Sequence, residues 1–249
     1  MPNSSLSRDE WFGSSIGRYL LEQELALHDV AVADVFGFHA LQLGFPEADL
    51  LRANRIPHKF RIWHGAGADL RASFDALPLA TQRFDLVILP HVLEFAEFPH
   101  RILREVDRVM MPEGRVIITG FNPWSLWGLR RWMRRSNAAY PWRGNFISLL
   151  RIKDWLSLLG FEVSAARLAC YVPPVTRDQW IRRFGFLEDA GDRWWAVGGG
   201  VYMVQAIKRV QGMRILAAPW AVKRVENGLA PAPRSAGVPK SRANLRVVK

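Results

Sequence analysis

Apolar residues recur with two different periods along this chain, and each period predicts one type of element. From about Ile16, apolar residues stand three or four positions apart, which is typical of a helix that buries one face. These residues are Leu21, Leu25, Val32 and Val35. Gly37 follows where a left-handed helix cap belongs, so we expect the helix to end there.

Strand patterns follow that helix. Residues 40–44 form a short apolar segment before a turn, and residues 84–89 are nearly all apolar, which is typical of a strand buried on both faces of a parallel sheet. Four further segments have strand character: 59–64, 115–119, 161–168 and 201–208. Helical patterns start at Pro99 and at about Leu149. This alternation predicts a parallel, doubly wound α/β sheet.

Composition narrows the class of protein. The chain has 249 residues, 49% of them apolar, which suits one large globular domain. The single cysteine, Cys170, excludes a disulfide framework and a cysteine-built zinc site. No apolar run approaches the roughly 18 residues that a membrane span needs. We therefore expect a cytoplasmic protein without a transmembrane segment.

Positive charge is concentrated at one end of the chain. The formal net charge is +11, and residues 221–249 contain seven basic residues and one acidic residue. This segment also contains three prolines and no apolar periodicity. We predict a disordered basic tail over 221–249 and one domain over 1–220.

Four motifs in order suggest a family. Residues 74–79 read FDALPL and 84–87 read FDLV; HVLE follows at 91–94, and LREVDRVMMPEGR occupies 103–115. This order resembles class I S-adenosylmethionine-dependent methyltransferases of the methyltransferase type 11 pattern, and the rest of the chain resembles an uncharacterised bacterial subfamily of them. The resemblance implies a seven-stranded Rossmann-like sheet with an antiparallel last strand. It also implies S-adenosyl-L-methionine as cofactor and no required metal.

The resemblance implies a cofactor site at the carboxyl ends of the strands. Asp75 would accept a hydrogen bond from the adenine amine, and Ala76 and Leu77 would offer backbone contacts to the ring. The other implied cofactor contacts are Gln42, Gly44, Leu89 and Pro90.

Two turns depart from the family pattern. A turn of the D-x-G-C-G-x-G type normally follows the first strand, but residues 41–46 (LQLGFP) contain one glycine and no acid. An alternative alignment places Asp34–Phe38 on this motif; we favour 41–46, because the helical period runs through Val35. After the second strand, where an acid normally holds the ribose hydroxyls, the chain reads HGAGA and the nearest acid is Asp69.

His91 follows the buried strand 84–89, with Glu94 three residues later. A histidine with a pKa near neutral suits a general base that removes a proton from an oxygen or nitrogen nucleophile. Alternatively, His91 caps or packs the turn. Its spacing to Glu94 and His100 matches no standard metal motif, so we expect no metal site.

Two acceptor-side insertions, at about 123–146 and 171–199, are rich in tryptophan and arginine. After Asn122-Pro123, a helix over about 123–135 carries the first cluster, and the second runs from Trp180 to Trp195. Such surfaces suit an anionic or aromatic acceptor or a nucleic acid, although tryptophans packed beneath a solvated basic face would give the same pattern.

The sequence therefore predicts a methyltransferase with an unidentified acceptor. The alternative is an inactive methyltransferase-like protein that binds RNA or another polyanion through the Trp/Arg clusters and the tail. The one-glycine turn and the positive charge are the reasons for that alternative.

Overall fold

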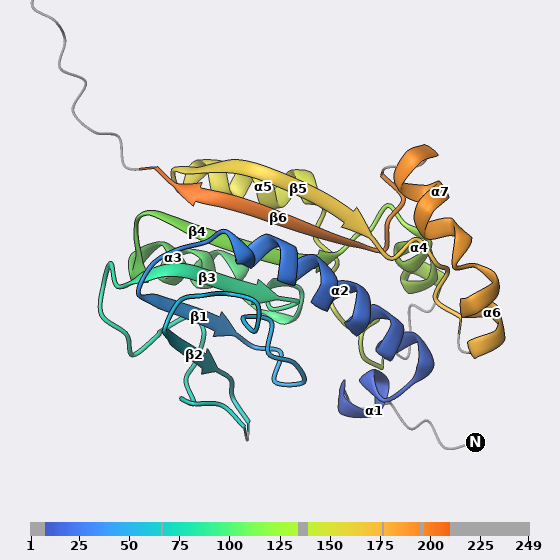
Figure 1. The fold of residues 1–249 in the computed structure, drawn as a ribbon, viewed down its shortest axis with the longest axis horizontal. Coiled ribbons are helices and arrows are strands. Elements are labelled where there is room, and N and C mark those ends of the chain that lie inside the picture. Colours follow the sequence, from blue (N-terminus) through green and yellow to red (C-terminus); the bar gives the residue numbers. More distant parts are fainter. Residues whose placement is uncertain (1–7, 66, 134–138, 176, 195–196, 210–249) are drawn as a thin grey trace, which may run out of the picture. The chain divides into compact units, whose positions relative to one another are not determined.

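The computed structural model describes residues 8–65, 67–133, 139–175, 177–194 and 197–209. The predicted tail, residues 221–249, lies outside them. Within the described residues, six strands form one sheet in the order β2-β1-β3-β4-β6-β5 (Figure 1). The strands are β1 (His39–Leu43), β2 (His58–Ile62), β3 (Phe84–Pro90), β4 (Met110–Phe121), β5 (Phe161–Ala169) and β6 (Val201–Lys208).

The sheet confirms the predicted α/β class and its antiparallel last strand. Strands β2, β1, β3 and β4 are parallel to one another, whereas β6 runs antiparallel to both β4 and β5. The predicted count of seven strands differs from the six strands of the described residues. Beside β2, Leu70 forms a single parallel bridge with Ile62, so pairing at this edge does not extend into a strand.

Helices cover both faces of the sheet (Figure 1). They are α1 (Arg8–Phe12), α2 (Ser15–Ala33), α3 (Pro99–Val109), α4 (Leu126–Met133), α5 (Leu149–Leu158), α6 (Asp178–Arg183) and α7 (Phe186–Trp194), with a 3₁₀ turn, η1 (Leu93–Phe95). Helix α2 packs on one face with Leu86 and Ile88 of β3, while α3 and α5 pack on the other face with Val87 and Leu89. The alternating sides of β3 therefore supply two separate cores.

Helix α2 buries only part of the face that was predicted, because Val32 is buried as expected but Leu21 and Leu25 are not. Its fully buried residues follow an i, i+4 stripe through Leu20, Glu24, His28 and Val32, whereas Leu21 and Leu25 are only half-buried. In the first half of the helix the buried positions lie one residue before the predicted Leu21 and Leu25, and two of the four residues on the stripe are polar. Because these polar groups are buried, they need partners within the protein.

The predicted end of α2 is also wrong. The helix ends at Ala33 with Asp34 as its cap, three residues before Gly37. Gly37 instead allows the chain to pass Asp85, because a Cβ at this position would lie 2.3 Å from the Asp85 Cβ. Since Asp34–Phe38 precedes β1, the alternative alignment is excluded and the turn after β1 is the one that contains Gly44.

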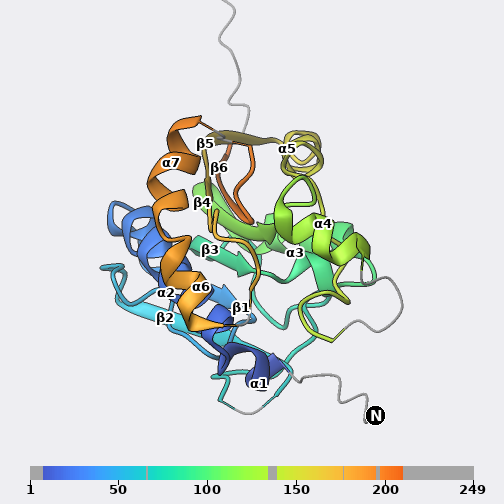
Figure 2. The ribbon, with the colours of Figure 1, turned by 90° about the vertical axis from the view of Figure 1, so that its right-hand side faces the viewer.

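The carboxyl ends of the parallel strands point to one side of the sheet. Figure 2 looks at that side, where α1, α4, α6 and α7 surround the strand ends. Helix α4 starts at Leu126, later than the start predicted at about 123, and α6 and α7 were not predicted. Across the described part of the chain, no helix has the length and apolar character needed to cross a bilayer.

Candidate functional site

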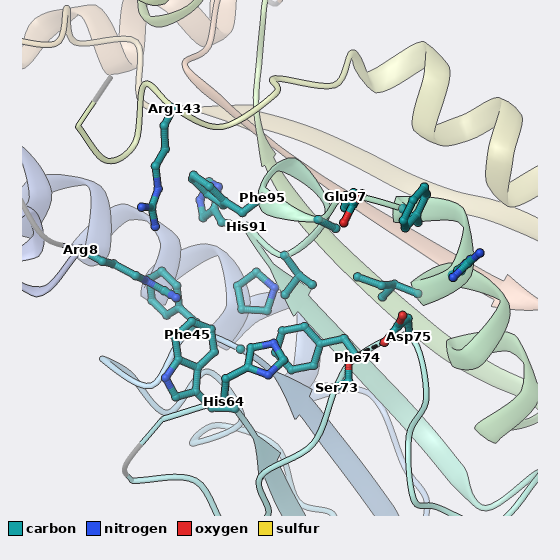
Figure 3. A pocket seen from close by; sticks show the side chains of 18 of the residues that line it. Arg8, Phe45, His64, Ser73, Phe74, Asp75, His91, Phe95, Glu97 and Arg143 are labelled. Carbon is teal, nitrogen blue, oxygen red and sulfur yellow. Dashed lines mark hydrogen bonds between the residues drawn. The ribbon is translucent and has the colours of Figure 1, made fainter. Parts of the chain in front are cut away.

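A pocket of about 450 Å³ opens at the carboxyl ends of β1 and β3. Its walls come from the turns after these two strands, from residues 63–64 and 73–75, from the segment 95–102, from α1 and from residues near Tyr140 (Figure 3). Open parallel sheets bind ligands at this edge, and the volume falls in the range of small-molecule sites. This pocket is therefore the candidate functional site.

The turn after β1 forms the floor of the pocket. Gly44 and Phe45 have φ values of 75° and 60°, in the left-handed region. A Cβ on Gly44 would lie 3.0 Å from a methyl carbon of Val92, so glycine keeps this turn close to its neighbour. The predicted glycine therefore lines the pocket.

Gln42 shapes this turn from beneath. Its side-chain amide donates to the carbonyl oxygens of Gly44, Phe45 and Ala48 at 3.2, 2.9 and 2.8 Å. Its carbonyl oxygen accepts from the Leu50 N–H at 3.1 Å. The side chain is fully buried and does not line the pocket, so the structure gives Gln42 a bracing role in place of the predicted cofactor contact.

The turn after β3 is held by a buried ionic cluster. His91 has a φ of 50°, and its backbone N–H donates to the Thr119 carbonyl at 3.0 Å. One ring nitrogen, Nδ1, lies 2.9 Å from Glu94 Oε2, and the other, Nε2, contacts Glu24 Oε1. Glu94 also accepts the Phe121 N–H. His91, Glu24 and Glu94 are the residues of the cluster that we call the buried triad.

The buried triad gives His91 a fixed charge. Burial lowers the pKa of His91, but the carboxylates of Glu24 and Glu94 outweigh burial and raise that pKa to about 10. Both ring nitrogens donate to carboxylates, so His91 has no free nitrogen for a proton from an acceptor. The structure therefore does not fit the predicted role of His91 as a general base. It fits the alternative, in which His91 fixes the turn.

The opposite wall contains Asp75. Its carboxylate is exposed to the pocket and accepts a hydrogen bond from the Ser73 hydroxyl, which lowers the pKa of Asp75 (Figure 3). The rings of His64 and Phe74 lie beside Asp75, with their centroids 4.5 Å apart. Asp69, the nearest acid after β2, instead accepts the Arg61 N–H at 2.8 Å and does not line the pocket.

Some of the remaining predicted cofactor contacts line the pocket and others do not. Pro90 lines the pocket together with Gly44, Asp75 and His91, whereas Ala76, Leu77 and Leu89 do not. The Leu77 N–H donates to Glu105 at 2.9 Å and its carbonyl accepts from Arg108 at 2.9 Å, so both backbone groups bind α3. Leu89 is fully buried in the core.

The lining residues that the sequence analysis missed include Arg8, Phe95, Tyr140 and Arg143. The Arg8 guanidinium pairs with Glu47 at 2.9 Å and lies within 6 Å of the ring centroids of Phe12, Phe45, Trp63 and Tyr140. The sequence gives weak signals for these residues, because most of their contacts join segments far apart in the chain. Tyr140 and Arg143 do fall inside the predicted insertion 123–146.

The Trp/Arg clusters divide between core and surface. Trp127 and Trp142 are buried, and Arg130 lies 5.3 Å from the Trp142 ring centroid, so these residues pack as the plainer interpretation expected. Trp124, Trp132 and Trp180 are exposed. Trp195 and the side chain of Trp194 lie outside the described residues.

Comparison with known proteins identifies this architecture. A family profile described as "Methyltransferase domain" matches residues 53–118. A structure from Thermotoga maritima, a SAM-dependent methyltransferase described as a possible histamine N-methyltransferase, is 15% identical with a TM-score of 0.60, covering 81% of this chain and 94% of that one. The chain has the class I methyltransferase fold. A SAM-dependent methyltransferase from Archaeoglobus fulgidus is 17% identical with a TM-score of 0.55, covering 77% of this chain and 94% of that one.

Relatives of this methyltransferase fold include proteins without an assigned activity. The uncharacterised protein YafS of Escherichia coli is 37% identical over 131 residues, which are 52% of this chain and 55% of YafS. The uncharacterised protein MJ1123 of Methanocaldococcus jannaschii is 30% identical over 91 residues, 36% of this chain and 44% of that protein. The chain thus spans about half the length of the curated relatives it matches.

Proposed function

We propose that this chain transfers a methyl group from S-adenosylmethionine to a small-molecule acceptor. The observation that carries the proposal is the meeting of Gly44, Asp75 and Pro90 in one pocket at the strand ends of a methyltransferase fold. These three residues come from separate segments, and the motif resemblance assigned all of them to the cofactor.

The pocket residues fit this cofactor. The glycine turn leaves room where a Cβ would meet Val92, so a ligand can lie close to the backbone. Asp75 presents an ionised carboxylate that can accept from an adenine amine, next to the Phe74 ring. Arg8 Nη2 is buried without a hydrogen-bond partner among the described residues, and it can donate to the carboxylate of the amino-acid moiety.

Positioning is the catalytic contribution that these residues support. When bound, S-adenosylmethionine would supply a methyl group on a sulfonium sulfur: a nucleophilic atom of the acceptor would bond to the methyl carbon as the carbon–sulfur bond breaks, with S-adenosylhomocysteine as the leaving group. Gly44 and Phe45 would support one side of the ligand, while Pro90 and the turn fixed by His91 would hold the other. Holding two reactants in line accounts for a large part of such a rate enhancement.

Binding of S-adenosylhomocysteine, measured by titration calorimetry on the full chain, tests the proposal. We expect the wild type to bind, and Asp75→Asn to bind about tenfold more weakly, because a hydrogen bond to a charged acceptor is lost. The matched control is Asp154→Asn, an exposed carboxylate on α5 that does not line the pocket. Absence of binding to the wild type at millimolar ligand would overturn the proposal.

A further inference from the structure

The end of the pocket opposite Asp75 gathers two arginines and two aromatic rings. We call Arg8, Phe95, Tyr140 and Arg143 the arginine end. The Arg8 guanidinium carbon lies 5.7 Å from the Tyr140 ring centroid, and Tyr140 stacks on Phe95 with centroids 5.1 Å apart. The Arg143 guanidinium carbon lies 5.9 Å from the Phe95 centroid. Figure 3 shows Arg8 and Arg143 on the same side, away from Ser73 and Asp75.

Hydrogen-bond donors at the arginine end lack acceptors. The Tyr140 hydroxyl is buried and has no hydrogen-bond partner within the described part of the chain, although the residue is only 3% exposed and lines the pocket. A buried hydroxyl without a partner is costly, so its place in a pocket wall indicates a ligand atom that completes it. Burial also raises the pKa of Tyr140, which keeps the phenol a donor.

Charge at this end is only partly balanced. Arg8 has an ionic partner in Glu47, at 2.9 Å. Arg143 forms no ion pair with any described carboxylate, and its guanidinium lies over the Phe95 ring. The Arg143 guanidinium can only donate hydrogen bonds, and the Tyr140 hydroxyl has its proton free to donate, so both can bind the oxygens of a carboxylate or phosphate in this pocket.

We propose that Arg143 and the Tyr140 hydroxyl bind an anionic group, a carboxylate or phosphate, on the methyl acceptor. This inference rests on the proposed function, because the acceptor must lie beside the cofactor in the same pocket. The Arg8 guanidinium carbon lies 5.2 Å from the ring centroid of Phe45, in the turn that contains Gly44. This position suits binding of the cofactor's own carboxylate. Arg143 lies beyond Phe95 on the segment after α4, which leaves it for the second reactant.

Three probes test the chemistry on the full chain saturated with S-adenosylhomocysteine. They are benzoate, benzyl alcohol as its uncharged counterpart, and inorganic phosphate. Calorimetry should detect benzoate or phosphate but not benzyl alcohol. Arg143→Gln should weaken the anion by about tenfold or more and Tyr140→Phe by roughly fivefold, in proportion to the charged and neutral hydrogen bonds lost. Arg104→Gln, an exposed arginine on α3 outside the pocket, should change nothing.

A second arm separates the two possible sources of the anion. S-adenosylhomocysteine contains an amino-acid carboxylate, whereas 5′-methylthioadenosine lacks it. If Arg143→Gln lowers the affinity for S-adenosylhomocysteine but not for 5′-methylthioadenosine, the anion is the cofactor's own and the inference is overturned. Failure of both anions to bind at tens of millimolar also overturns it, while leaving the proposed function intact. Anion binding by a chain that does not bind S-adenosylhomocysteine would remove the proposed function, and it would also overturn the assignment of the anion to a methyl acceptor.

Discussion

Two adjacent turns of the pocket both hold backbone in the left-handed region, but different side-chain chemistry stabilises each turn. The turn after β1 and the turn after β3 both contain left-handed residues, Gly44 with Phe45 in one and His91 in the other. Gln42 braces the first through four neutral hydrogen bonds to backbone groups. The buried triad braces the second through an imidazolium between two carboxylates.

The two turns differ in whether the buried side chains that brace them have all their hydrogen-bond partners. Gln42 uses both ends of its amide, so the first turn has neutral and complete hydrogen bonding around it. In the buried triad, two carboxylates share one cation, and Glu24 Oε2 has no hydrogen-bond partner among the described residues. Buried charge is stable only while each partner is present. The second turn should therefore be the more sensitive to substitution and the only one of the two that responds to pH.

Loss of the imidazolium should have the largest effect. His91→Asn keeps a residue that tolerates positive φ but leaves Glu24 and Glu94 buried without a cation. We expect the free energy of unfolding to fall by about 3–5 kcal/mol, as when one partner of a buried pair is removed. Urea unfolding followed by circular dichroism measures this, with the exposed His58→Asn as control. A loss below about 1 kcal/mol would contradict the ionic brace.

Loss of the neutral brace should cost less. Gln42→Leu keeps the volume but leaves the carbonyls of Phe45 and Ala48 and the N–H of Leu50 without a buried partner. We expect a loss of about 2–3 kcal/mol in the free energy of unfolding, near the cost of unsatisfied buried backbone groups. The same urea titration applies. A larger loss than for His91→Asn would reverse the ranking of the two turns.

A side chain at the glycine of the first turn should have a smaller effect on stability. Gly44→Ala forces an L-residue into the left-handed region and brings its Cβ to 3.0 Å from Val92. We expect a loss of about 1–2 kcal/mol, together with weaker binding of S-adenosylhomocysteine. Gly67→Ala, also at positive φ but with no atom within 4 Å of the added Cβ, is the control for backbone strain alone. Equal ligand affinity in the two variants would contradict the close approach.

The smallest expected effect is a difference between the two turns in how the free energy of unfolding depends on pH. Because the folded-state pKa of His91 is raised to about 10 from an ordinary value near 6.5, its stabilisation is complete below pH 6.5 and is lost as the pH rises toward 10. The stability gap between wild type and His91→Asn should shrink by at most about 1.4 kcal/mol per pH unit. The gap for Gln42→Leu should stay constant from pH 7 to 9.5. A constant gap for His91→Asn would show that the imidazole is not charged.

Local patterns predicted most of the sheet. The apolar run at 84–89 is a central strand because both of its faces are covered. The one-glycine turn at 41–46 was the favoured alignment, and the position of β1 after Asp34–Phe38 excludes its rival, although the helix ends before Val35. Helix α2 was placed correctly but its buried face was displaced, since a periodicity search counts apolar residues and the buried stripe includes Glu24 and His28. A glutamate and a histidine four residues apart on one helical face were the available signal.

The candidate site was less predictable because its partners are distant in sequence. His91 was identified from its place after β3, but its state depends on Glu24, which lies on α2 67 residues earlier. Arg8 and Tyr140 meet across more than half of the chain, and no local period reports such a contact. Short sequence motifs were enough to locate Gly44 and Asp75. The residues of the arginine end come together only when the chain folds, so no motif indicates them.

Strand β6 has a consequence for the order in which the protein can fold during synthesis. It is the last strand of the sheet in the chain, yet it lies between β4 and β5 and pairs with both. A nascent chain that ends before Val201 has β5 without its partner strand and the outer edge of β4 open. The sheet therefore closes only after residues 201–208 emerge, and until then an unpaired edge is exposed to chaperones and to other nascent chains.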